Sequence, residues 1–256
     1  MGLESAKEEL QLKNRIKDLA DKSFQQNIYT FTGFLGLSEQ DIFWQVVGDI
    51  KYTRYELWGG VENAERKVVR FGAEEDLGYV EEYPIVCIHI QPVIEKFADN
   101  LSHRDFLGAL MNLGIERSTL GDIKITGKEA YLFCLESIAE YILTNLDKIK
   151  HTSVKCTLVE SIADIPAEEP EHMEVLLPSL RMDVCLAKVY NKSRGDILEY
   201  FRGKKVYVNG RLCENNSRLL KEGDVVNLRG FGKFIFTGTY YETKKGKLRV
   251  EVAIFR

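Results

Sequence analysis

The sequence lacks the closely spaced cysteines that a zinc site or a disulfide framework needs. Its five cysteines are Cys87, Cys134, Cys156, Cys185 and Cys213, and no CxxC or Cys/His ligand pair is present. Most of them have apolar neighbours, so we expect small core residues rather than metal ligands or redox groups. No metal and no cofactor is predicted.

Membrane and targeting signals are also missing. No apolar run reaches the roughly 18 residues that a membrane-spanning helix needs, and residues 1–20 are amphipathic and acidic, unlike a secretory signal. Gly2 is present, but Ala6 stands where a myristoylation motif needs Ser or Thr. The sequence predicts a cytoplasmic protein without a membrane partner.

One fragment imitates an enzyme motif. His103-Arg104-Asp105 opens like a kinase catalytic loop, but Leu110 stands where that loop needs a metal-binding Asn. Ser102 and Asp105 instead have the spacing of a capping box, which predicts the start of a helix. His103 and Arg104, at this exposed helix start, are candidates for a second contact with RNA. The alternative is that both are simply solvated.

The charges are distributed unevenly. Residues 178–256 hold 17 Lys and Arg against 8 Asp and Glu, whereas residues 1–177 hold 18 against 31. A basic C-terminal third on an acidic body is typical of a nucleic-acid-binding module attached to another domain. A merely solvated basic face is the alternative.

Two acidic, poorly periodic stretches, 73–84 and 163–178, look like linkers. They predict an α+β protein with three parts: a small N-terminal α+β domain (1–72), a central domain (80–162) and a basic C-terminal domain (178–256). In the first part we expect a helix over about 4–26, a helix capped by Ser38, and strands at 50–58 and 65–72.

The central part reads as β-α-β-β-α-β over 83–160, the ferredoxin-like arrangement that RNA-recognition (RRM) domains share. Its second helix is expected over 137–149. Alternation places Tyr131 and Phe133 on one face, with His89 on a neighbouring strand. These rings resemble a base-stacking platform, but the basic and glycine-rich RRM signature is missing, so core packing is favoured.

In the C-terminal part, Ser179 and Ser193 are predicted to cap two short helices, and Gly203 to end the second. Asn209-Gly210 predicts a hairpin turn. Beyond 229 we expect a bent strand with a basic rim and a hairpin around 244–246. Gly230 and Gly232 do not form a dinucleotide loop, because no helix or third glycine follows. The residues expected to contact RNA are Arg181, Lys188, Lys192, Ser193, Arg194, Arg202, Lys204, Lys205, Asn209 and Arg211.

Residues 179–228 resemble the RNA-binding domain named after small-subunit ribosomal protein S-four: two helices on a small β-sheet. The matching residues are Arg181, Asp183, Ser193-Arg194, Val208-Asn209-Gly210 and Gly223-Asp224-Val225. The run 201–205 departs from the usual pattern of that domain.

The stretches 59–67 and 101–123 extend the resemblance to the YlmH family of bacterial and plastid proteins. These combine an N-terminal domain, an RRM-like domain and a C-terminal S-four domain. The resemblance implies binding of rRNA or tRNA on the ribosome, a role with stalled large subunits, and no catalysis.

Two alternatives stay open. Enzymes that modify RNA also carry S-four domains, but Leu180-Arg181-Met182-Asp183 lacks the glycine of the pseudouridine synthase GRLD motif, and no synthetase or methyltransferase motif is present. An enzyme with a concealed active site is therefore one alternative. A protein-interaction adaptor that uses the acidic body is the other.

Overall fold

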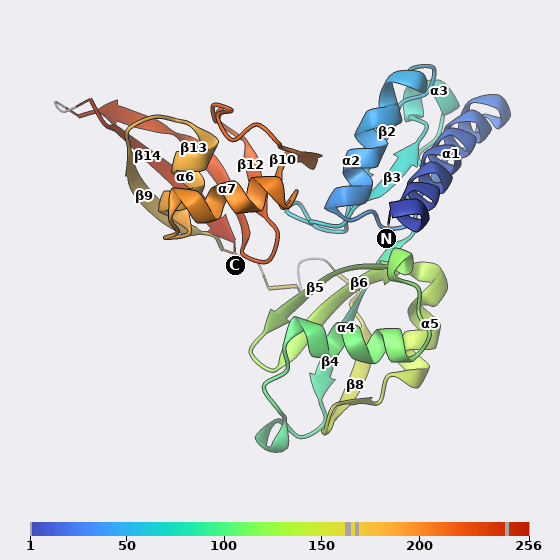
Figure 1. The fold of residues 1–256 in the computed structure, drawn as a ribbon. Helices are drawn as coiled ribbons and strands as arrows, with labels where there is room; N and C mark the ends of the chain where they lie inside the picture. The colour runs from blue at the N-terminus through green and yellow to red at the C-terminus, as the bar shows by residue number, and fades with distance from the viewer. Residues whose placement is uncertain (1, 162–164, 167–168, 244–245, 256) are drawn as a thin grey trace. The chain divides into compact units, whose positions relative to one another are not determined.

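The computed structural model describes residues 2–161, 165–166, 169–243 and 246–255. The chain forms two compact units, residues 1–166 (unit 1) and 167–256 (unit 2). Three antiparallel sheets and the helices that cover them give a mixed α+β fold (Figure 1). The expected N-terminal and central domains both lie in unit 1, and their division into separate domains stays a prediction.

The first part of unit 1 packs two helices on a three-stranded sheet of order β1-β3-β2. The two expected helices and the two expected strands are confirmed. Ser38 as a helix cap is wrong, because α2 begins at Leu37 and the Glu39 carboxylate accepts a hydrogen bond from the Gly36 N–H at 2.6 Å. The elements are α1 (Gly2–Gln26), β1 (Thr30–Phe31), α2 (Leu37–Val46), η1 (Val47–Asp49), β2 (Tyr55–Trp58), β3 (Val68–Phe71) and α3 (Glu74–Leu77).

The second part of unit 1 has the expected β-α-β-β-α-β order, with strands arranged β5-β6-β4-β8-β7. Its second helix ends four residues earlier than predicted, because Lys148 and Ile149 leave the helix to pair with β8. Side chains of α4 and α5 bury one face of the sheet. The elements are β4 (Ile85–Pro92), η2 (Glu95–Phe97), α4 (His103–Asn112), η3 (Arg117–Thr119), β5 (Leu120–Thr126), β6 (Glu129–Leu135), α5 (Glu136–Asn145), β7 (Lys148–Ile149) and β8 (Thr152–Leu158).

The opposite face of this sheet is partly covered by the first part of unit 1. Phe34 and Val68 from the first part pack with Cys87 and Phe133 from the sheet in one buried cluster. Gly60 permits this close approach. Its φ is +95°, and a Cβ there would lie 2.4 Å from Cδ1 of Phe133. Only a residue without a side chain fits at this point.

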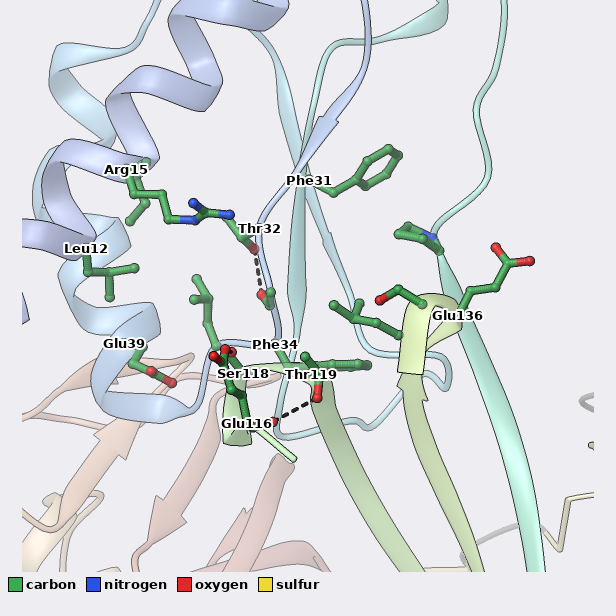
Figure 2. Close-up of a pocket in the computed structure, with 16 residues that line it drawn as sticks. Leu12, Arg15, Phe31, Thr32, Phe34, Glu39, Glu116, Ser118, Thr119 and Glu136 are labelled. Carbon is green, nitrogen blue, oxygen red and sulfur yellow. Dashed lines mark hydrogen bonds between the residues drawn. The ribbon is translucent and has the colours of Figure 1, made fainter. Parts of the chain in front are cut away.

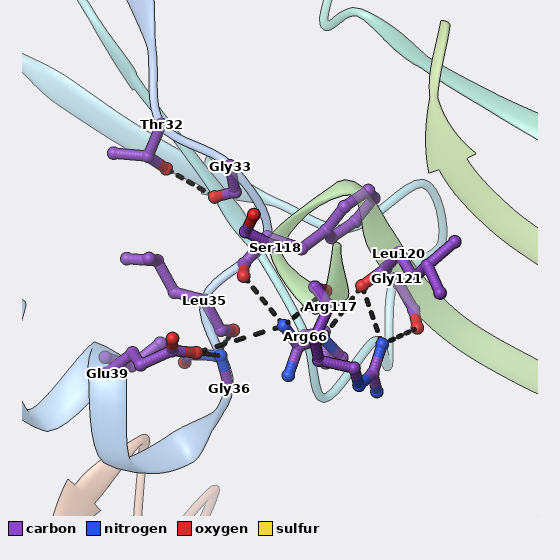
Figure 3. Close-up of polar contacts among 12 residues, drawn as sticks. Thr32, Gly33, Leu35, Gly36, Glu39, Arg66, Arg117, Ser118, Leu120 and Gly121 are labelled. Atoms are coloured by element: carbon purple, nitrogen blue, oxygen red, sulfur yellow. Dashed lines mark hydrogen bonds and ion pairs between the residues drawn. The ribbon is translucent and has the colours of Figure 1, made fainter. Parts of the chain in front are cut away.

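Polar contacts fix the same junction (Figure 3). The Arg66 guanidinium donates to the carbonyls of Phe34 at 2.8 Å and Leu120 at 2.9 Å. In return, the Asp122 carboxylate accepts from the N–H groups of Glu65 at 2.6 Å and Arg66 at 3.1 Å. The stretches 59–67 and 101–123, which carry the YlmH resemblance, therefore meet in space, and much of their content serves to join the two parts of unit 1.

Unit 2 packs helices α6 and α7 on a six-stranded sheet of order β11-β10-β12-β13-β14-β9 (Figure 1). Strand β9 falls inside the predicted second linker, so that prediction is wrong for 171–177. Residues 163–164 and 167–168 of the same stretch lie outside the described chain. The elements are β9 (Glu171–Leu177), α6 (Met182–Val189), α7 (Arg194–Arg202), β10 (Val206–Val208), β11 (Arg211–Leu212), β12 (Val225–Leu228), β13 (Gly232–Glu242) and β14 (Leu248–Phe255).

The predicted turns and caps of unit 2 are mostly confirmed. Ser193 is the N-cap of α7, and its hydroxyl accepts from the Asp196 N–H at 3.1 Å. Gly203 ends that helix, and Asn209 and Gly210 have φ values of 53° and 75° as the turn requires. Ser179 as a cap is wrong, because the N-cap of α6 is Arg181. Strands β13 and β14 form the expected hairpin, and residues 244–245 of its tip lie outside the described chain.

Candidate nucleic-acid interface

A buried carboxylate holds two of the expected RNA-binding arginines together. Asp183, on the first turn of α6, is fully buried, while the side chains of Arg181 and Arg194 are 37% and 59% exposed. Arg181 donates from Nε at 3.0 Å and from Nη2 at 3.1 Å, and Arg194 donates at 2.6 Å. The carboxylate thus orients two guanidinium groups whose other N–H donors stay open to solvent.

The charges explain how this Arg181–Asp183–Arg194 clasp is stable. Burial alone would raise the pKa of Asp183, but hydrogen bonds from Arg181 and Arg194 and their positive charges outweigh it and lower the pKa to about 2. One negative charge against two positive ones leaves the clasp with a net charge of +1 at neutral pH. Such a pre-oriented pair of guanidinium groups suits phosphate oxygens.

A second carboxylate organises the hairpin turn. Asp224 accepts from the Asn209 side-chain amide at 2.8 Å and from the Arg218 guanidinium at 3.3 Å. The Asn209 side-chain oxygen in turn accepts from the Val225 N–H at 2.8 Å. Asn209 therefore has a structural role in closing the turn, and its amide is already engaged.

The remaining predicted residues of unit 2 lie on its surface without a common centre. Lys188, Lys192 and Lys205 are exposed, and Arg202 forms an ion pair with Glu199 on the same helix. Two more of the predicted RNA-binding residues are exposed: Lys204, whose Nζ lies 3.9 Å from the Glu214 carboxylate, and Arg211 on β11.

Sequence reasoning missed Asn216 and Arg218, which add donors to Asp183 and Asp224. In the sequence, Asp183 and Asp224 stand out only as matches to the S-four pattern. The sequence does not indicate that Asp183 binds Arg194, eleven residues away on another helix, or that Asp224 binds Arg218 in the preceding loop.

His103 and Arg104 are adjacent in sequence, but their surroundings differ. Partial burial and the charge of Arg117 lower the pKa of His103, against the opposing effect of Asp122. A neutral imidazole at pH 7 is a poor phosphate ligand. Arg104 instead lines a surface hollow of about 410 Å³ together with Lys148 and Lys150.

The Asp105 carboxylate forms hydrogen bonds and an ion pair that fix the start of α4. It accepts from the Ser102 N–H at 2.8 Å and hydroxyl at 2.7 Å, and it forms an ion pair with Lys150 at 2.8 Å. The hydrogen bond from Lys150 and those from Ser102 lower its pKa to about 2. The predicted capping box is therefore confirmed, and a carboxylate this acidic is a weak general base.

The central sheet does not present the open stacking platform that RRM domains use. Phe133 is only 1% exposed, because it packs against the first part of unit 1, and this confirms the predicted core role. Tyr131 and His89 stack on one another with centroids 4.6 Å apart and planes at 8°. His89 also lies 2.8 Å from Glu129, so its polar edge is engaged.

The pocket in Figure 2 lies within unit 1 and has a volume of about 770 Å³. Its lining includes apolar residues such as Phe34 and Leu12, together with three glutamates and one arginine, Arg15. One of them, Glu39, already accepts the Gly36 N–H. An acidic lining disfavours phosphate, which leaves the basic surface of unit 2 as the better RNA interface.

The cysteines are core residues, as predicted for them. Four are buried and Cys156 is half-buried, and burial raises the pKa of Cys87 to about 12, so its reactive thiolate is scarce at neutral pH. Within the part of the chain that the structure describes, no three His, Cys, Asp or Glu side chains gather as a metal site would require, and no helix is long and apolar enough to span a membrane.

Comparison with known proteins shows similarity to one family. Residues 79–162 match the family described as "Putative RNA-binding domain in YlmH". The chain is also 29% identical over 220 residues to the ribosome-associated protein quality control protein P2 of Bacillus subtilis (strain 168), covering 86% of this chain and 84% of that protein. The chain is therefore similar to YlmH proteins, and residues 79–162 match their RNA-binding domain.

A solved YlmH structure supports the fold. The cell division protein ylmH from Streptococcus pneumoniae matches with a TM-score of 0.50 and 19% identity, over 62% of this chain and 95% of that one. The matched YlmH RNA-binding region begins after the first part of unit 1 and ends before unit 2. The clasp therefore lies outside it.

Proposed function

We propose that this protein is a member of the YlmH family that binds structured RNA of the ribosome, either rRNA or tRNA, through an S-four-type surface on unit 2, and that it acts without catalysis. The observation that carries the proposal is the clasp, in which a buried Asp183 orients Arg181 and Arg194 toward solvent. Unit 2 holds 17 Lys and Arg against 12 Asp and Glu, so its overall charge also favours a polyanion.

The ribosome is the proposed partner because a relative similar over most of this chain is named as ribosome-associated and as a quality control protein. The large subunit is the part of the ribosome we expect, in the cytoplasm, during translation or the handling of stalled ribosomes. The central, RRM-like domain is proposed as a second contact. Arg104 is the better candidate of the predicted pair there, since His103 is not held in its charged form.

Co-sedimentation with ribosomal subunits over a series of salt concentrations tests this proposal. Wild-type protein is compared with Arg194→Ala and with Arg249→Ala, a control of equal charge whose guanidinium pairs with Glu174 on strand β9. Because each phosphate contact releases counterions, loss of Arg194 is expected to weaken binding about tenfold and to reduce the salt slope by roughly one. Arg249→Ala is expected to bind as wild type does.

An unchanged slope for Arg194→Ala would remove the clasp from the phosphate surface. Subunit binding that survives deletion of 178–256 would move the search to the acidic unit 1 and favour the adaptor. Turnover of a ribosomal RNA base by the purified protein would favour the concealed enzyme.

A further inference from the structure

A group of aromatic side chains near the C-terminal ends of α6 and α7 is not used by the clasp. Phe231 lies in the tight connection between β12 and β13, where Gly230 and Gly232 have φ values of 91° and 98°. Its ring centroid is 5.2 Å from that of Tyr200 on α7 and 5.9 Å from that of Tyr190, which ends α6. All three rings are half-buried, so each keeps some surface open to solvent.

Two exposed lysines lie over these rings, and the exposed Arg229 is on the same turn as Phe231. Lys192 Nζ lies 5.2 Å from the Phe231 centroid, and Lys205 Nζ lies 5.7 Å from that of Tyr200. Arg229 lies two residues before Phe231, and its backbone N–H donates to the Lys205 carbonyl at 2.9 Å. None of the three forms an ion pair with any residue that the structure describes. We call the three rings and these three cations the Phe231 cluster.

The backbone presents Phe231 in a defined position. The Phe231 N–H donates to the Leu228 carbonyl at 2.8 Å, and the Tyr190 hydroxyl donates to the Gly232 carbonyl at 3.2 Å. The aromatic ring is thus fixed on a turn, while the lysines above it are long and solvated. Exposed lysine–ring contacts are weaker than stacking of a base on an aromatic side chain, so a base can displace the lysines toward neighbouring phosphates.

We infer that the Phe231 cluster binds an unpaired nucleobase of the RNA, stacked on Phe231 or Tyr200, while Lys192, Lys205 and Arg229 hold the adjoining phosphates. The inference rests on the proposed RNA binding by unit 2 and adds to it a preference for loops or bulges over a continuous duplex. The clasp, at the N-terminal end of α6, grips the backbone, and the cluster, at the other end of that helix, selects an unstacked base.

Two RNAs of equal length and charge test this preference, with the full-length protein. One is a hairpin with 2-aminopurine in its unpaired loop, whose fluorescence reports stacking, and the other is a fully paired duplex. Phe231→Leu is compared with Phe231→Tyr, which keeps the ring, and with Tyr241→Leu, which removes a 52% exposed ring from strand β13. Thermal unfolding establishes that each variant is folded.

Phe231→Leu is expected to weaken hairpin binding about tenfold, to change duplex binding less than about twofold, and to abolish the change in 2-aminopurine fluorescence. Phe231→Tyr and Tyr241→Leu are expected to match wild type. If Phe231→Leu lost affinity equally for both RNAs, or lost none for the hairpin, the inference would be overturned. The proposed function would still stand if the protein bound the duplex in a salt-dependent way. Failure of the wild-type protein to bind either RNA would overturn both.

Discussion

At the scale of single residues, Asp183 determines where two exposed arginines lie. Its folded pKa of about 2 is below the ordinary 3.8, so its ionised form stabilises the native state above pH 4, and this contribution is lost as the pH falls toward 2. Asp183→Asn keeps the shape but not the charge. We expect it to lower the free energy of unfolding by about 2 kcal/mol at pH 7, measured by urea denaturation followed by circular dichroism.

The matched control is Glu199→Gln, which removes a carboxylate from an exposed ion pair with Arg202 in the same unit. Surface pairs contribute little, so less than about 0.5 kcal/mol is expected. The difference between wild type and Asp183→Asn should shrink between pH 4 and pH 2. Equal stability of the two proteins at pH 7 would show that the arginines gain nothing from the buried charge.

At the candidate site, the sequence indicates the basic residues but not the partners that hold them, and their role in RNA binding stays a prediction. The basic positions follow from charge and from the S-four resemblance. That Asp183 joins Arg181 to Arg194 depends on how α6 and α7 pack, and that Phe231 meets Tyr200 depends on the β12–β13 turn. Such contacts between distant positions follow from tertiary packing, which local pattern does not encode.

At the scale of elements, two serines precede helices of unit 2, but only one of them caps its helix. Ser193 caps α7 by accepting from the Asp196 N–H, whereas the N-cap of α6 is Arg181, two residues after Ser179. We expect Ser193→Ala to lower the free energy of unfolding by about 1 kcal/mol and Ser179→Ala to have no measurable effect. Chemical denaturation of both variants checks this, and a similar loss for both would contradict the observed start of α6.

The periodic elements of the fold were predictable for the same local reasons. Apolar spacing revealed the helices and the order of the central strands, and glycine with asparagine marked the hairpin turn. Acidic composition concealed β9, in which Glu171 and Glu174 are exposed while Val175 and Leu177 are buried. The helix predicted to reach 149 ends early, since pairing with β8 outweighs the helical pattern there.

The junction within unit 1 depends on a glycine that has no room for a side chain. Gly60 and Gly78 both have positive φ, 95° and 78°, but a Cβ would clash with Phe133 only at Gly60. Alanine at either position therefore carries a similar backbone strain, and only Gly60→Ala adds overpacking. We expect Gly60→Ala to be less stable than Gly78→Ala by about 1–3 kcal/mol, measured by urea denaturation of the full chain. Equal losses would mean that Phe133 moves aside at little cost.

At the scale of the whole molecule, the two units carry opposite charge. Residues 1–166 hold 18 Lys and Arg against 27 Asp and Glu, a net of −9, and residues 167–256 hold 17 against 12, a net of +5. The core of unit 2 is built entirely from its own residues, so we expect this unit to fold alone. Because unit 1 is acidic and tethered to unit 2, it repels any RNA bound to unit 2 with which it makes no favourable contacts of its own.

We therefore expect the fragment 167–256 to bind a random-sequence duplex RNA more tightly than the full chain does at low salt, by about tenfold at 50 mM, and by little at 300 mM, because screening removes the repulsion. Fluorescence anisotropy over that range of salt concentrations measures the difference. Acidic unit 1 would then lower the affinity for RNA of random sequence. Binding would be restricted to RNA sites that accommodate both units. Tighter binding by the full chain at every salt concentration would show instead that unit 1 supplies RNA contacts of its own, and Arg104 with Lys148 and Lys150 would be the first residues to replace.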